Sequence, residues 1–143
     1  MPAVRKETVG HCMRRTLIAS VVFALGVVAC RQWSSSSVET AFANHSSGVE
    51  VQAAGKVVAL LSDDVEGSHH QRFIVRLDSG TTVLISHNID IAPRVSSLRI
   101  GDRIAFAGEY VWNAKGGLIH WTHRDPSGRH SAGWVKHNGE TFQ

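Results

Sequence analysis

The sequence contains little cysteine, proline or tyrosine. Its 143 residues include two cysteines, three prolines and one tyrosine. Both cysteines, Cys12 and Cys30, lie in the first 30 residues, so the rest of the chain has no thiol. This excludes disulfides, cysteine nucleophiles and cysteine-ligated zinc from the part after Cys30. A metal ion bound there would need ligands from His, Asp, Glu or Asn.

The chain also lacks an excess charge once its first 30 residues are set aside. The whole sequence is basic, with a formal charge of +3 and a pI of about 9.2. Four of its 15 basic residues and one of its 12 acidic residues precede Cys30, which leaves eleven of each. This balance gives no support for nucleic acid as a partner. Eight of the nine histidines also follow Cys30, a density that needs an explanation.

The longest apolar run is too short to span a bilayer. Residues 17–29 are interrupted by Ser20 and Gly26 and fall short of the roughly 20 apolar residues that a membrane helix needs. Arg14 and Arg15 precede the run, as is typical of a secretory signal peptide. We therefore expect residues 1–29 to be a signal peptide, with Met13 as a candidate natural start.

The run ends in Val-Val-Ala before Cys30, which resembles the lipobox of bacterial lipoproteins. The resemblance implies cleavage before Cys30 and lipid attachment to its thiol. It also implies an exported, membrane-anchored lipoprotein of the outer membrane, periplasm or cell surface, since Arg31 replaces the Asp of the inner-membrane retention signal. The alternatives are an uncleaved amphipathic anchor and ordinary signal cleavage that leaves Cys30 as a free thiol.

Short alternating segments after residue 48 predict one all-β domain. Residues 30–48 are rich in Ser and Ala without an apolar period, so we expect a lipidated flexible tether there. The domain then covers residues 49–143, with strands predicted at 51–61, 71–77, 81–87, 103–112 and 118–123. Pro93 is suited to opening a short helix between the third and fourth strands.

This order resembles the OB-fold, a five-stranded Greek-key barrel. The segment LRIGDRIAFAG at residues 98–108 is similar to the start of the fourth strand in such barrels. We therefore predict an OB-fold-like barrel with one short helix, and another antiparallel barrel or a β-sandwich is the alternative.

The densest polar segment runs from His120 to His137. It contains the sequence HWTHRDPSGRH at residues 120–130, in which Asp125-Pro126-Ser127-Gly128 predicts a turn. In a regular strand His120 and His123 would point to opposite faces, so they would not chelate one ion together. The turn would bring Arg129 and His130 back toward the end of the fifth strand.

Three chemical functions fit these residue types. A hydrolase acting on phosphodiesters would use His120, His123, His130 and Arg129 for acid–base catalysis and charge stabilisation, with Arg94 and Arg124 as further phosphate contacts. A divalent transition metal would be held by His123, Asp125 and His130, with His70 or His87 as a further ligand. A ligand-binding module, for a small molecule or a polyanion, would use His70, Arg72, His87, Asn88, Asp90, Arg94 and Trp121. For each single histidine, a structural hydrogen bond is the alternative to a functional role.

The segments HQRFIVRL, HNIDIAPR, GDRIAFAGEY and HWTHRDPSGRH together resemble a bacterial family of small secreted proteins of unknown function. The resemblance covers residues 55–143 and implies an OB-like fold. It implies no activity, so function has to be inferred from the site.

Overall fold

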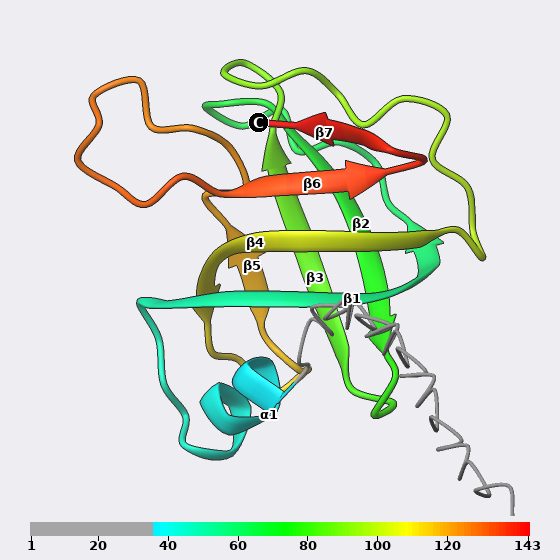
Figure 1. Ribbon diagram of the computed structural model, residues 1–143, viewed down its shortest axis with the longest axis vertical. Helices are drawn as coiled ribbons and strands as arrows, with labels where there is room; N and C mark the ends of the chain where they lie inside the picture. The colour runs from blue at the N-terminus through cyan, green and yellow to red at the C-terminus, as the bar shows by residue number, and fades with distance from the viewer. Residues whose placement is uncertain (1–35) are drawn as a thin grey trace, which may run out of the picture. The chain divides into compact units, whose positions relative to one another are not determined.

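The computed structural model describes residues 36–143, which form one helix and seven strands (Figure 1). The elements are α1 (Ser36–Ala43), β1 (Val49–Leu60), β2 (His70–Leu77), β3 (Thr82–Asn88), β4 (Arg103–Val111), β5 (Leu118–His120), β6 (Trp134–His137) and β7 (Glu140–Phe142). No helix in this part of the chain is long and apolar enough to cross a membrane.

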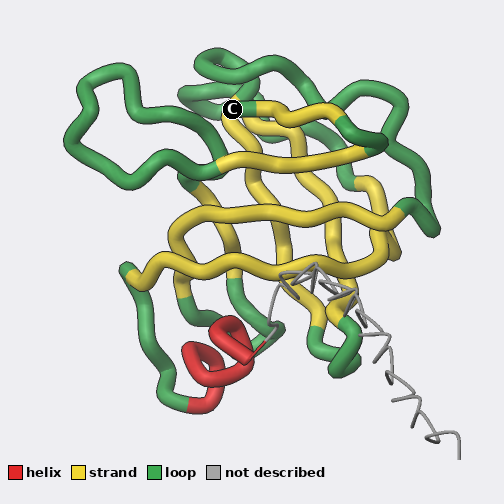
Figure 2. The backbone as a smooth tube through the Cα atoms, in the orientation of Figure 1, coloured by secondary structure: helices red, strands yellow, loops and turns green. Residues whose placement is uncertain are grey.

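Five of the strands close into a barrel. They pair in the order β1-β2-β3-β5-β4, and β4 pairs again with β1, so that the sheet has no gap (Figure 2). Strands β3 and β5 are parallel, and the other pairs are antiparallel. This is the strand order of an OB-fold-like Greek-key barrel, and the predicted fold class is confirmed.

Strand β1 pairs with two neighbours along different parts of its length. Its first half pairs with β4 and its second half with β2, and both registers include Gly55. A Cβ atom at Gly55 would lie 2.4 Å from the carbonyl oxygen of Arg76. Glycine at this position therefore permits the close strand approach that closure requires.

The barrel interior is filled by side chains that alternate along each strand. The largest fully buried residues include Phe73, Ile85, Phe106, Tyr110 and Ile119. The Tyr110 hydroxyl donates a hydrogen bond to the carbonyl of Gly116, 3.1 Å away, so its polar atom is satisfied inside the core. The outward positions between these residues are free to carry polar side chains.

The short helix lies elsewhere than expected. Residues 89–102 form turns and irregular loop. The Gln71 side chain bonds both backbone polar groups of Val95, at 2.8 and 3.1 Å, so these two groups are not available for helical hydrogen bonds. The helix is instead α1, within the segment 30–48 predicted to be a tether. Its Val38 and Ala41 are buried in the core, so the folded unit includes residues well before position 49.

Two strands were not predicted. Strands β6 and β7 form a hairpin that extends the sheet beyond β4. Its turn is Asn138-Gly139, with φ of 48° and 83°, the left-handed conformation that two-residue hairpin turns require. The loop of residues 121–133 that connects β5 to β6 stands out from the barrel (orange in Figure 1). The predicted signal peptide, the lipid-attachment site Cys30 and residues 30–35 of the tether lie outside the described residues.

Candidate functional site

A row of polar side chains crosses three adjacent strands on the outside of the barrel. Glu50 of β1 pairs directly with Glu109 of β4, and Glu109 pairs directly with His120 of β5. Their neighbours Val51, Tyr110 and Ile119 are buried. Because side chains alternate along a strand, the row faces outward.

His130 reaches this row from the loop of residues 121–133. Its Nε2 lies 3.0 Å from an oxygen of Glu109 and 3.5 Å from an oxygen of Glu50. The second oxygen of Glu109 lies 3.0 Å from Nε2 of His120. Glu109 therefore bridges two histidines, and Glu50 completes a cluster of two carboxylates and two imidazoles. We call these four residues the Glu/His cluster.

The two carboxylates of the cluster place two negative charges close together, and a nearby positive charge would stabilise them. Two carboxylates directly opposite each other on neighbouring strands repel one another. His130 supplies the compensating charge in this structure, since its Nδ1 also lies 2.9 Å from the carbonyl oxygen of Ser131. A carbonyl and a carboxylate can only accept, so both ring nitrogens of His130 carry protons. The contact with Glu109 raises the pKa of His130, and the same contact lowers the pKa of Glu109.

Three residues of the cluster could hold a metal ion. One ligand atom each from Glu50, Glu109 and His130 lies within 4.8 Å of the other two, and among the described residues this is the group of three that meets that condition. Carboxylate oxygen and imidazole nitrogen together suit zinc and its first-row neighbours. A metal would take the place of the Nε2 proton of His130.

The surroundings of these ligands match the usual support of a metal site. The Nδ1–H of His130 donates to a backbone carbonyl, and His120 donates to the Glu109 oxygen that does not face His130. Such outer hydrogen bonds fix the tautomer of a ligating histidine and the orientation of a ligating carboxylate. His120 is thus placed to support the site through Glu109.

Asp125 shapes the loop that presents His130. Its carboxylate accepts hydrogen bonds from the backbone N–H groups of Ser127, Arg129 and His130, at 2.8 to 2.9 Å, and from the Ser127 hydroxyl. The hydroxyl contact is the largest cause that holds the pKa of Asp125 well below its usual range. At the base of the loop, Gly133 N–H donates to the carbonyl of His123.

The indole ring of Trp121 packs against the face of the His130 imidazole. The two rings are stacked, with centroids 4.3 Å apart and planes 8° apart, and the His123 ring lies 5.2 Å from the Trp121 ring. Trp121 has φ of 52°, in the left-handed region that a bulky residue rarely adopts. Such a conformation costs on the order of 1–3 kcal/mol and persists only where the surroundings impose it.

The predicted metal set was His123, Asp125 and His130, and the structure places His130 beside Glu109 and Glu50. Asp125 is engaged within its own loop. His123 is buried, and its Nδ1 donates to the carbonyl of Arg124. Of the predicted catalytic residues, His120 and His130 meet at Glu109, whereas Arg129 donates to the Ser127 hydroxyl.

The predicted binding residues other than Trp121 hold two loops together at one end of the barrel. Each of them uses its polar atoms locally: His70 on the Ser68 carbonyl, Arg72 on the Ser62 carbonyl, Asn88 on the N–H of Asp90, Asp90 on His69, and Arg94 on Asp63. His87 is fully buried between Thr122 and the carbonyl of Pro93. Burial lowers the pKa of His87, so its ring is neutral.

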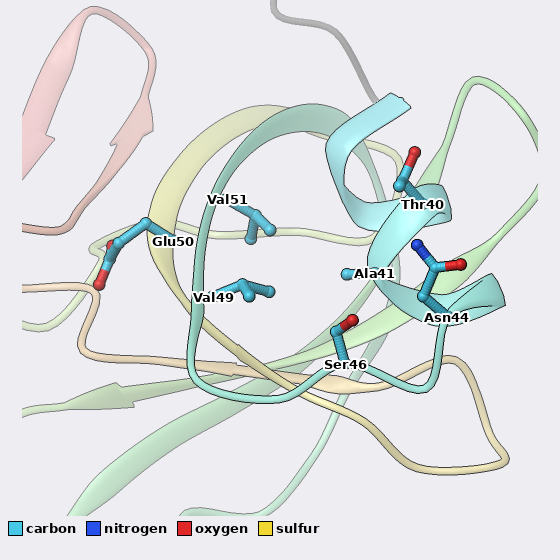
Figure 3. Close-up of a pocket in the computed structure, with 7 residues that line it drawn as sticks. All are labelled: Thr40, Ala41, Asn44, Ser46, Val49, Glu50 and Val51. Atoms are coloured by element: carbon cyan, nitrogen blue, oxygen red, sulfur yellow. The ribbon is translucent and has the colours of Figure 1, made fainter.

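A pocket of about 330 Å³ lies between α1 and the start of β1. Val49 and Val51 point into it, whereas the Glu50 side chain points to the other side of the strand (Figure 3). The other side chains that line it, from Thr40, Ala41, Asn44 and Ser46, are small or uncharged. The pocket therefore offers no convergent charged groups, and the Glu/His cluster remains the candidate site.

Glu50 and Glu109 were not among the residues predicted from the sequence. Glu109 could have been found, because counting back from the turn that joins β4 and β5 places it opposite His120. Glu50 could not have been found in this way. Its position depends on the pairing of β1 with β4, two strands that are far apart in the sequence.

The fold and the cluster define a small closed β-barrel domain with a polar, histidine-bearing outer site. The chain matches the model of a family described as protein of unknown function (DUF3465) over residues 21–143, and it belongs to that family. The resemblance to an uncharacterised family, predicted from four sequence motifs, is confirmed. No curated protein shows significant similarity to the chain.

Proposed function

We propose that this protein is a ligand-binding barrel module whose ligand is a divalent transition metal ion. The observation that carries the proposal is the convergence of Glu50, Glu109 and His130 from two strands and a loop, with ligand atoms within 4.8 Å of one another. Three protein ligands leave a coordination position for water or a further ligand. Zinc fits this ligand set, and cobalt, nickel and copper are the alternatives to compare.

Metal titration of the purified, chelator-treated protein tests this proposal. We expect one equivalent of Zn²⁺ to bind, and Glu109→Gln to weaken binding on the order of tenfold or more, because it replaces a charged ligand with an amide of the same shape. Glu66→Gln is the matched control, since Glu66 is an exposed loop residue outside the cluster. Absence of binding, or equal binding by Glu109→Gln, would overturn the proposal.

The phosphodiesterase alternative receives less support from the geometry. Arg94 is paired with Asp63, and Arg129 is bound to Ser127. Two of the three arginines that this mechanism would use on a phosphate are therefore engaged within loops. Metal binding requires no arginine, since the negative charges of Glu50 and Glu109 complement the positive charge of the metal ion.

We also propose that the module is exported and anchored to a membrane by a lipid on Cys30. The support is the basic and apolar sequence before Cys30 and the small residue Ala29. The mass of the mature protein tests it: we expect a chain that begins at residue 30 and carries acyl groups. A Cys30→Ser variant should lose the lipid and leave the membrane fraction. A wild-type chain without acyl groups would contradict the anchor.

A further inference from the structure

Trp121 combines a strained backbone with a close ring contact. Four described residues other than glycine have positive φ, namely His45, Ser97, Trp121 and Asn138, and Trp121 has the bulkiest side chain of these. It directly follows His120, the last residue of β5. The strand thus ends where the chain turns into a conformation that tryptophan does not favour.

The backbone of a neighbouring segment packs closely against Trp121. A Cβ atom at Gly133 would lie 1.8 Å from the carbonyl oxygen of Trp121 and 2.7 Å from that of Ala107. The loop returns across Trp121 at this point, and only glycine leaves room for it. The backbone of Trp121 is therefore tightly packed against the returning loop.

The ring is placed where it restrains His130. His130 lies on a loop, and rotation of its imidazole would move Nε2 away from Glu50 and Glu109. Two contacts oppose this rotation: the hydrogen bond from Nδ1 to the Ser131 carbonyl, and the parallel stack on Trp121 at 4.3 Å. The hydrogen bond fixes one edge of the ring, and the stack fixes its plane.

We infer that Trp121 is a positioning residue for the metal site, which holds the imidazole of His130 in the orientation that directs Nε2 at the two carboxylates. This inference rests on the proposed metal-binding function. A positioning role accounts for the strained backbone of Trp121, because strained residues that persist in a fold cluster at functional sites. Outer hydrogen-bond partners that orient a ligating histidine are worth 10- to 100-fold in metal affinity, and the stacked indole restrains the same imidazole.

Three variants separate positioning from simple packing. Trp121→Phe keeps a planar ring, Trp121→Leu keeps apolar volume without a planar ring, and Trp121→Gly relieves the backbone strain and removes the side chain. We expect Trp121→Phe to retain Zn²⁺ affinity within a few-fold. Trp121→Leu and Trp121→Gly should each lose about tenfold or more. The free energy of unfolding of each variant is measured on the same samples without metal. The ranking of the three variants by Zn²⁺ affinity should differ from their ranking by this free energy.

Indole fluorescence supplies a second, independent readout. Cu²⁺ quenches indole at short range, and the Trp121 ring stacks directly on the ligand His130. Binding of one equivalent of Cu²⁺ should quench part of the wild-type emission, and this part should be missing in Trp121→Phe. The emission of the other three tryptophans, Trp33, Trp112 and Trp134, serves as the internal reference in both proteins.

The outcomes distinguish this inference from the proposal beneath it. Wild-type protein that binds no Zn²⁺ overturns the metal site, and the positioning role falls with it. Wild-type protein that binds Zn²⁺ while folded Trp121→Leu binds equally well overturns the positioning role alone. Recovery of affinity in Trp121→Phe, together with loss in Trp121→Leu, supports both.

Discussion

His87 and His130 show two opposite uses of histidine in one small barrel. His87 is fully buried, and its ring contacts one group that must accept and one that can donate, the Pro93 carbonyl and the Thr122 hydroxyl. A neutral imidazole satisfies both contacts. His130 lies at the surface among groups that only accept, from Glu109 and Ser131. A neutral imidazole cannot satisfy both of these.

The difference shows how partners, more than sequence context, decide what a histidine does. A histidine between one donor and one acceptor, such as His87, is neutral and connects a loop to the barrel. Two acceptors, one of them charged, give a position that attracts either a second proton or a metal ion. Other described histidines also make local structural contacts: His70 and His123 bond backbone carbonyls, and His69 and His137 each bond a single carboxylate. This explains their high density without assigning a function to each one.

The largest effect is expected from removing the buried histidine. His87→Leu leaves the Thr122 hydroxyl and the Pro93 carbonyl without partners, and we expect the free energy of unfolding to fall by about 2–4 kcal/mol. Urea denaturation followed by circular dichroism measures this loss. Zn²⁺ affinity should remain close to that of the wild type, because the change lies outside the Glu/His cluster.

Thr122→Val provides the control for that prediction. If the lost contact with Thr122 contributes to the instability of His87→Leu, the double variant His87→Leu/Thr122→Val should be more stable than the sum of the two single losses implies. Valine at position 122 needs no hydrogen-bond partner. Strict additivity would contradict a direct hydrogen bond. A His87→Leu protein as stable as the wild type would remove the basis for calling this histidine structural.

The second effect concerns stabilisation by metal. At a free Zn²⁺ concentration of 100 times Kd, binding should raise the free energy of unfolding by about 2.7 kcal/mol, less any binding to the unfolded chain. We expect this gain in the wild type and in His87→Leu, and its loss in His130→Ala. Thermal unfolding with and without Zn²⁺ measures it. An equal gain in His130→Ala would place the metal elsewhere.

The fold was largely predictable because its information is local. Alternating apolar residues identify all five barrel strands, and short polar turns define the hairpins. The helix was misplaced at a point where Gln71, a residue from β2, bonds both backbone polar groups of Val95 and leaves neither for a helical hydrogen bond. Conversely, Val38 and Ala41 are too few apolar residues among serines to indicate α1, and tertiary contact with the core provides most of its stability.

The site was predictable only in part, because two of its members depend on long-range pairing. His120 and His130 lie in a segment whose polar density is visible in the sequence. Glu50 and Glu109 look like ordinary surface glutamates until β1 pairs with β4. Asp125 shows the same limit, because a sequence does not reveal that a carboxylate accepts hydrogen bonds from the turn that follows it.

The third effect is a difference in pH dependence between the two histidines, measured without metal. Burial lowers the pKa of His87 below its usual 6.5, so the unfolded state gains a proton first and stability falls as pH drops below about 6.5. Contact with Glu109 raises the pKa of His130 above 6.5, so its contribution is lost as pH rises above that value. Between them, the two side chains favour a maximum near pH 6.5.

Urea denaturation at several pH values in the presence of chelator tests these signs. His87→Leu should flatten the acid side, where one proton accounts for at most about 1.4 kcal/mol per pH unit. His130→Gln should flatten the alkaline side by less, since solvent screens an ion pair near the surface. If both variants altered the same side of the curve, the contrast between the two histidines would be wrong.

The smallest effect is expected from Asp125→Asn, which tests whether the loop presents His130 to the carboxylates. Oδ1 of Asp125 accepts from the Ser127 N–H, and Oδ2 accepts from the N–H groups of Arg129 and His130. An asparagine keeps one acceptor, so one side of this arrangement must be lost. Zn²⁺ affinity should fall on the order of tenfold or less, because the ligands themselves remain.

Amide hydrogen exchange in residues 125–130 should become faster in the Asp125→Asn variant, while exchange in the barrel strands stays unchanged. Asp78→Asn is the matched control: it removes the same charge from an exposed turn, where Asp78 pairs with Arg103. If both variants weaken Zn²⁺ binding equally, the effect arises from net charge. If only Asp125→Asn weakens it, the structure of the loop is what holds His130 at the Glu/His cluster, and the barrel supplies the two carboxylates that meet it.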